Sequence, residues 1–206
     1  MKSTTLESVH TWSVWQADKR IDFNGFLWTR PTGGLLVDPM PLTDDQRAFL
    51  DERGRAQRIL LTNADHLRAA GELKGALGAE VLAPAADRER FGEQASLVDV
   101  WFEDALPGEL GELTQLAPLR GGKGPLEPAV YLREERAWLF GDLVRSHVSG
   151  RLMLLPEAKT SDRAQLIADV RALAGPPVEA VLLGDGDSLF RGAQAAWDEL
   201  QAALQA

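Results

Sequence analysis

The chain has 206 residues, of which 45% are hydrophobic, so it is long enough to bury a sizeable core within one domain. It contains no cysteine, which excludes disulfides, thiolate nucleophiles and cysteine-based zinc sites. The net charge is -9 and the charges are spread along the chain, so nucleic acid, which needs a basic surface, is not an expected partner.

The distribution of apolar residues bears on location. No apolar run approaches the roughly 20 residues that a membrane-spanning helix requires. The first seven residues, M-K-S-T-T-L-E, lack the apolar stretch of a signal peptide. We therefore expect a soluble protein of the cytoplasm that does not associate with membranes.

The first part of the chain has the pattern of antiparallel strands. Residues 8–16 alternate between polar and apolar side chains, and residues 23–30 repeat this alternation. A turn signal at 31–34 precedes a buried-strand candidate at 35–37, which ends in Asp38 and Pro39. These features predict a β-meander rather than a βαβ unit.

Helices and strands alternate after the meander. Thr43 and Gln46 have the spacing of a capping box, which predicts the start of a helix. Further elements are expected in this order: a strand at 57–62, a helix following His66, a short strand at 81–82 and a short helix at 84–91.

The second part repeats this content. It has an irregular β-like pattern at 98–119, a hairpin at 129–133 and 137–140, a helix at 161–174, a strand at 178–183 and a last helix from Ser188. Two halves of similar content predict two sheets packed face to face with helices outside.

Acidic or imidazole side chains follow directly on apolar runs at four places. These are Asp38, Asp65 with His66, Asp142 and Asp185. Strands that end at one edge of a sheet deliver their residues to a common cleft, so we expect these groups to converge. Taken singly, Asp65 is also what a helix cap looks like, and Asp185 is an ordinary turn residue.

The arrangement of these segments resembles the metallo-β-lactamase superfamily. That family has a strand ending in Thr-His-x-His-x-Asp-His, a Gly-His-Thr-Pro-Gly loop, a Gly-Asp after a hairpin and a late Gly-His-Gly. The matching segments here are T-N-A-D-H at 62–66, G-K-G-P at 122–125, F-G-D at 140–142, G-D-G at 184–186 and an early L-V-D-P at 36–39. The resemblance implies an α+β fold, a four-layer αββα sandwich, as a single metallo-β-lactamase-like domain over residues 1–206.

The resemblance also implies that the first metal site of the family is lost. The three histidines that form it correspond here to Leu61, Asn63 and Lys123. None of these is a good metal ligand, and a charged lysine has three donors and no acceptor.

The ligands of the second metal site are better retained. The resemblance assigns them to Asp65, His66 and Asp142, with Asp185 in place of the last histidine. A set rich in carboxylates favours one ion such as Mg²⁺, Mn²⁺ or Fe²⁺ over a typical zinc site, although Zn²⁺ stays among the candidates.

Two interpretations of function follow. The first is a metal-dependent hydrolase with this reduced mononuclear site, in which Asp65 and Lys123 are the candidate catalytic residues and an ester, thioester or similar small molecule is the substrate. The second is a metal-free, non-catalytic binding or scaffold protein, in which Lys123 replaces the first metal and neutralises Asp65 or Asp142. A homodimer stays open, and the substrate is undetermined because this fold serves many chemistries.

Overall fold

The computed structural model describes residues 1–53 and 55–205, which form two compact units, Met1–Trp101 and Phe102–Ala206. Each unit has its own cluster of buried hydrophobic residues. The single-domain organisation stays a prediction.

The first unit contains a seven-stranded sheet in simple chain order. Its strands are β1 (Lys2–Ser3), β2 (Val9–Gln16), β3 (Ile21–Trp28), β4 (Gly34–Val37), β5 (Ala56–Leu60), β6 (Glu80–Pro84) and β7 (Val100–Phe102). Strands β1 to β4 pair antiparallel, which confirms the predicted meander, whereas β4, β5 and β6 pair parallel.

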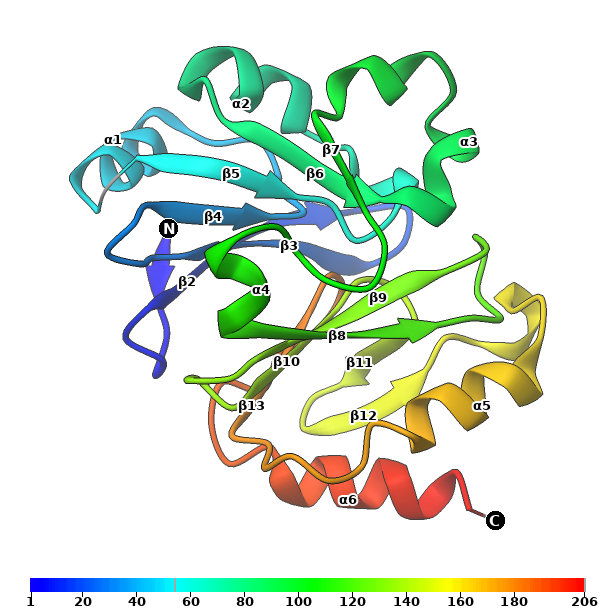
Figure 1. Cartoon of the computed structure of the whole chain (residues 1–206). Coiled ribbons are helices and arrows are strands. Elements are labelled where there is room, and N and C mark those ends of the chain that lie inside the picture. Colours follow the sequence, from blue (N-terminus) through cyan, green and yellow to red (C-terminus); the bar gives the residue numbers. More distant parts are fainter. Residues whose placement is uncertain (54, 206) are drawn as a thin grey trace. The chain divides into compact units, whose positions relative to one another are not determined.

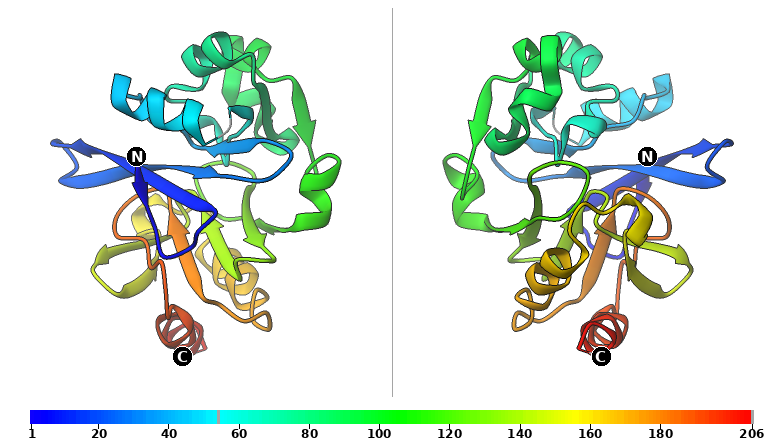
Figure 2. Two further views of the ribbon diagram at one scale, coloured as in Figure 1. Left: turned by 90° about the vertical axis from the view of Figure 1, so that its left-hand side faces the viewer. Right: turned by 90° about the vertical axis from the view of Figure 1, so that its right-hand side faces the viewer.

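Three helices lie on one face of this sheet (Figures 1 and 2). They are α1 (Asp44–Glu52), α2 (Ala70–Leu77) and α3 (Arg88–Phe91). The capping box predicted at Thr43 and Gln46 is present. The helix expected directly after His66 begins only at Ala70, because Arg68 adopts a φ of 38° and interrupts the helical turn.

The core of the first unit is a row of side chains that runs straight across the sheet. Leu27, Leu36, Ile59 and Val81 are directly opposite one another in successive strand pairs, and all are fully buried. They belong to one apolar cluster with Leu50 of α1 and Leu73 of α2. Removing this apolar surface from water is the main force that holds the helices against the sheet.

The second unit contains a four-stranded sheet and a separate hairpin. The sheet has the order β13-β10-β9-β8, with β8 (Thr114–Leu119), β9 (Glu127–Leu132), β10 (Ala137–Phe140) and β13 (Ala180–Leu183). Strand β13 pairs parallel to β10, and the other pairs are antiparallel. The hairpin consists of β11 (Val144–Val148) and β12 (Arg151–Leu154).

Helices α5 (Arg163–Arg171) and α6 (Gln194–Ala203) lie on one side of the four-stranded sheet (Figures 1 and 2). Aromatic rings fill the space between sheet and helix. Trp138 and Phe140 of β10 stack on Trp197 of α6, with ring centroids 6.4 and 5.9 Å away. Trp197 and Leu200 of α6 are buried in the same apolar cluster as these strands. Each unit is thus a sheet with helices on one face.

The second half differs from the sequence-based expectation in three details. The β-like stretch at 98–119 contains the short helix α4 (Glu109–Leu113), which begins after Gly108 with a φ of 58°. The hairpin β11–β12 was not predicted. The last helix begins at Gln194 rather than Ser188, because the chain first forms a β-bridge between Leu189 and Val181.

No helix within residues 1–53 and 55–205 is long and apolar enough to cross a membrane.

The loop before Lys123 is anchored through a glycine. Gly121 has a φ of 79°, and its carbonyl accepts hydrogen bonds from the amides of Ser161 and Asp162 at the start of α5. A Cβ at this position would lie 2.0 Å from the Asp162 carbonyl oxygen. The close contact therefore requires glycine and fixes the start of the loop.

Gly121→Ala should destabilise the protein much more than Gly150→Ala. Gly150 has nearly the same φ, 78°, but a Cβ there would meet nothing within 4 Å. The left-handed conformation alone costs about 1–2 kcal/mol, and only Gly121→Ala adds a backbone clash. Urea unfolding of both variants measures the difference, and equal losses would contradict the contact at Asp162.

Candidate functional site

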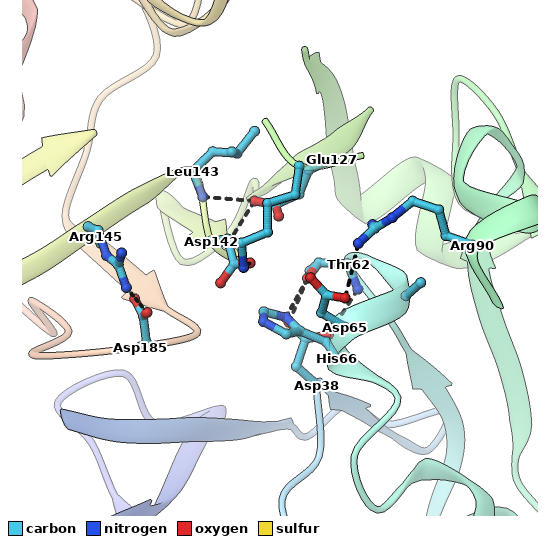
Figure 3. Close-up of polar contacts among 12 residues, drawn as sticks. Asp38, Thr62, Asp65, His66, Arg90, Glu127, Asp142, Leu143, Arg145 and Asp185 are labelled. Carbon is cyan, nitrogen blue, oxygen red and sulfur yellow. Dashed lines mark hydrogen bonds and ion pairs between the residues drawn. The ribbon is translucent and has the colours of Figure 1, made fainter. Parts of the chain in front are cut away.

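Asp38 is the buried centre of the polar contacts in the first unit. It follows β4, has a φ of 45° and is 1% exposed. Its carboxylate accepts hydrogen bonds from the Thr62 amide at 2.9 Å and the Thr62 hydroxyl at 2.7 Å, and the His66 Nδ1 atom lies 2.8 Å away (Figure 3). The parallel pairing of β4 with β5 places these segments side by side.

These contacts fix the charge of Asp38 and the orientation of His66. Burial would raise the pKa of Asp38, but the charge and hydrogen bond of His66, the charge of Arg68 and the Thr62 amide outweigh it, so the pKa is lowered. Because the carboxylate is an acceptor, the proton of a neutral His66 ring lies on Nδ1. The lone pair is then on Nε2, the arrangement of a base or a metal ligand.

Asp65 lies beside His66 in sequence but has a different partner. It is on a short 3-10 turn, Ala64–His66, and its carboxylate accepts a hydrogen bond from Arg90 at 3.0 Å. Arg90 also donates to the fully buried Asp87, which accepts the Ala64 amide. Burial would lower the pKa of Arg90, but Asp87 and Asp65 raise it, so the guanidinium is a lasting positive charge beside Asp65.

In the second unit, Lys123 and Asp142 form an ion pair. The Lys123 Nζ atom is 2.6 Å from Asp142 Oδ2. Asp142 follows β10, and the turn that carries it is held by the buried Glu127, whose carboxylate accepts the amides of Asp142 and Leu143 at 2.8 and 3.1 Å (Figure 3). The contact between Lys123 and Asp142 that the sequence offered as an alternative is therefore present.

Asp185 is paired with a different base, Arg145 of β11. Both side chains are buried, with 6 and 7% exposed, and the guanidinium donates to Asp185 Oδ2 (Figure 3). Burial lowers the pKa of Arg145, while the charges of Asp142 and Glu127 act in the opposite direction. His147 Nε2 lies 3.9 Å from the other oxygen of Asp185.

Each predicted metal-binding carboxylate thus has a basic partner within its own unit. Asp65 pairs with Arg90, Asp142 with Lys123, and Asp185 with Arg145. The convergence of Asp65, His66, Asp142 and Asp185 on one site stays a prediction.

Sequence reasoning did not identify Arg90, Glu127 or Arg145 as site residues. Arg145 had a usable signal, because it is a charged residue that directly follows two apolar residues in L-V-R-S. Glu127 gave a weaker one, at the start of a fully buried strand. Arg90 gave none, because its role depends on a tertiary contact with Asp65.

These contacts allow a test of whether the residues fit a divalent ion. A carboxylate binds a metal ion through the lone pairs of its oxygens, and a neighbouring cation competes for them. Here a basic side chain occupies that place at all three carboxylates. Among residues 1–53 and 55–205, no three Asp, Glu or His side chains are grouped as a metal site. A divalent ion bound through these carboxylates would therefore have to compete with Arg90, Lys123 and Arg145.

Asp38→Asn should destabilise the first unit by about 1–3 kcal/mol, because its amide group opposes one of the buried donors of Thr62 or His66. Asparagine tolerates the positive φ, so backbone strain does not explain the loss. The exposed Asp18→Asn is the matched control. Denaturant unfolding measures both, and a loss no greater than that of the control would contradict the assigned hydrogen bonds.

Arg145→Met should cost about 3–5 kcal/mol, because it leaves the buried Asp185 carboxylate without a cation. The double variant Arg145→Met with Asp185→Leu removes both charges and should recover most of this loss. A double variant as unstable as the single one would show that the ion pair is not the source of the effect.

The sequence profile of the metallo-beta-lactamase superfamily matches residues 1–204 of the chain. No curated protein matches by sequence. Solved structures of the fold do. A metallo-beta-lactamase from Pontibacter korlensis is 18% identical, with a TM-score of 0.68 over 96% of this chain and 94% of its own.

Two further structures give the same result. The DIM-1 metallo-beta-lactamase is 14% identical, with a TM-score of 0.71 over 97% of this chain and 94% of its own. A metallo-beta-lactamase family protein from Thermus thermophilus is 22% identical, with a TM-score of 0.64 over 97% of this chain and 80% of its own. These likenesses confirm the expected fold class, and with the profile match they show that the chain belongs to the metallo-β-lactamase superfamily.

Proposed function

We propose that this chain is a metal-free member of the superfamily. It binds a small molecule and does not catalyse metal-dependent hydrolysis. Members of the superfamily generally bind divalent metals. In this chain, basic side chains supply the positive charge that neutralises the carboxylates in place of the ion. The proposal is the second of the two interpretations of the sequence, extended from Lys123 to Arg90 and Arg145.

One observation carries the proposal: all three carboxylates at the second-site positions are paired with a base of their own unit. The Arg145–Asp185 pair is buried, whereas the Asp65 and Lys123 side chains are 45 and 40% exposed, so water screens these two pairs to about 1 kcal/mol or less each. A metal ion would have to displace these bases. They are covalently part of the protein and do not depend on the metal concentration.

The first-site positions support the same conclusion. Leu61 has no donor atom and is fully buried. Lys123 is bound to Asp142 and presents hydrogens rather than lone pairs. The chemistry that the superfamily performs with a metal-activated water therefore has no counterpart in these side chains.

The type of ligand follows from charge. With a net charge of -9 the chain is not suited to nucleic acid, so a small molecule is the proposed ligand. Location in the cytoplasm, independence of membranes and assembly as a homodimer stay predictions.

A mononuclear metal-dependent hydrolase is the second candidate, and one observation favours it. His66 directs Nδ1 to the buried Asp38, and metal-ligating histidines usually donate their second nitrogen to a carboxylate in this way. The candidate requires Arg90, Lys123 and Arg145 to give up their carboxylates to an ion.

Metal content separates the two candidates. We expect protein purified without chelator to contain Mn, Fe and Zn far below one ion per chain by elemental analysis. Its melting temperature should not change in EDTA. Stoichiometric metal that disappears in Asp142→Ala would contradict the proposal and support the hydrolase.

Lys123→Ala tests the role of the cation. It should lower stability by about 1 kcal/mol, since the Lys123 side chain is 40% exposed and water screens the pair. It should also increase the affinity for added Mn²⁺ or Zn²⁺, because it exposes the Asp142 carboxylate. The matched control is Lys159→Ala, an exposed lysine of the same unit. Equal metal affinity in both variants would count against replacement of the metal by Lys123.

A further inference from the structure

His10 is a buried titratable group that the proposed site does not use. It lies on β2 and is 2% exposed. Neither ring nitrogen has a hydrogen-bond partner among residues 1–53 and 55–205. A buried polar group without partners costs free energy, so an imidazole in this position is unusual for a purely structural residue.

The surroundings of His10 accept a neutral ring and oppose a charged one. The ring meets the edge of Phe49 on α1, with centroids 5.1 Å apart at 77°. The Arg53 guanidinium lies over the Phe49 ring, 5.2 Å from its centroid. The neighbours of His10 across the strands are Ser3 on β1 and Leu27 on β3, and neither carries a charge.

Both charged groups that act on His10 are positive. Burial is the main reason that the pKa of His10 is lowered, and Arg53 of α1 and the α-amino group of Met1 lower it further. Within residues 1–53 and 55–205, no carboxylate contributes to this shift. A proton added to the ring would therefore be buried, without an acceptor and next to like charge.

We propose that His10 is an acid-sensitive contact between β2 and α1: the neutral ring holds the helix against the sheet, and protonation releases it. The contact is linked to the segment after β4 through another residue of β2. Trp12, two residues on, donates its indole hydrogen to the carbonyl of Met40, two residues after Asp38. Loosening of β2 therefore acts on the segment that carries Asp38.

The direction of the pH effect follows from linkage. Because His10 binds a proton less readily in the folded protein than in the unfolded chain, acid favours the unfolded or open form. The neutral His10 ring therefore stabilises the folded protein fully above the ordinary histidine pKa of 6.5, and this contribution is lost as the pH falls below that value.

The test compares wild type with His10→Phe, which keeps the ring contact with Phe49 but cannot titrate. Between about pH 7.5 and pH 5.5, the melting temperature of wild type should fall by about 2–4 °C more than that of the variant. Hydrogen exchange in α1 should accelerate over the same interval in wild type only. His147→Gln removes a histidine of the other unit, so it should keep the acid-dependent acceleration of hydrogen exchange in α1.

His10→Gln provides a second non-titrating variant if phenylalanine does not fit. It should also lose the acid-dependent fall. An NMR titration of the His10 ring gives the direct readout and should show protonation below the ordinary range. Protonation at or above pH 6.5, or the same pH dependence in wild type and both His10 variants, would overturn the proposal.

Discussion

A carboxylate that is removed from water must be neutralised or bonded, and this constraint shapes both units. Asp185 and Asp38 are almost fully buried. The first is neutralised by a guanidinium, and the second accepts the donors of Thr62 and His66. In a metalloenzyme of this superfamily an ion supplies much of that charge. Under the proposed function, bases from neighbouring segments supply this charge instead.

The same constraint explains how backbone and side chains cooperate. Gly121 allows the loop before Lys123 to contact the start of α5, and Glu127 binds the turn that carries Asp142. The lysine and its carboxylate are therefore each positioned by a separate anchor. An ion pair between two anchored groups loses less conformational entropy than one between free surface chains.

The sequence predicted the acids better than their partners. Asp38, Asp142 and Asp185 were found because each follows a run of apolar residues, and such runs identify strands without any tertiary information. Arg90 could not be found in this way. It pairs with Asp65 across 25 positions of sequence, and only the packed unit brings the two together.

Two elements were not predicted from the sequence, and the reasons are also physical. The hairpin β11–β12 had a turn signal at Ser149 and Gly150, but its first strand, V-R-S-H-V, contains three polar residues and gives no clear apolar face. Helix α4 has only five residues, too few for a helical period to be recognised. Long elements with a full apolar face, such as β2 and α6, were recognised, apart from the first residue of α6.

The central claim is that Arg90, Lys123 and Arg145 take the place of a metal ion. Its most direct test is a crystal structure of the protein soaked in excess Mn²⁺ or Zn²⁺, with anomalous diffraction data. If the basic side chains replace the ion, no anomalous peak should appear at Asp65, Asp142 or Asp185, and the Lys123 ammonium should stay within hydrogen-bond distance of the Asp142 carboxylate. A peak about 2.0–2.2 Å from the oxygens of these carboxylates, with Lys123 turned away, would contradict the claim.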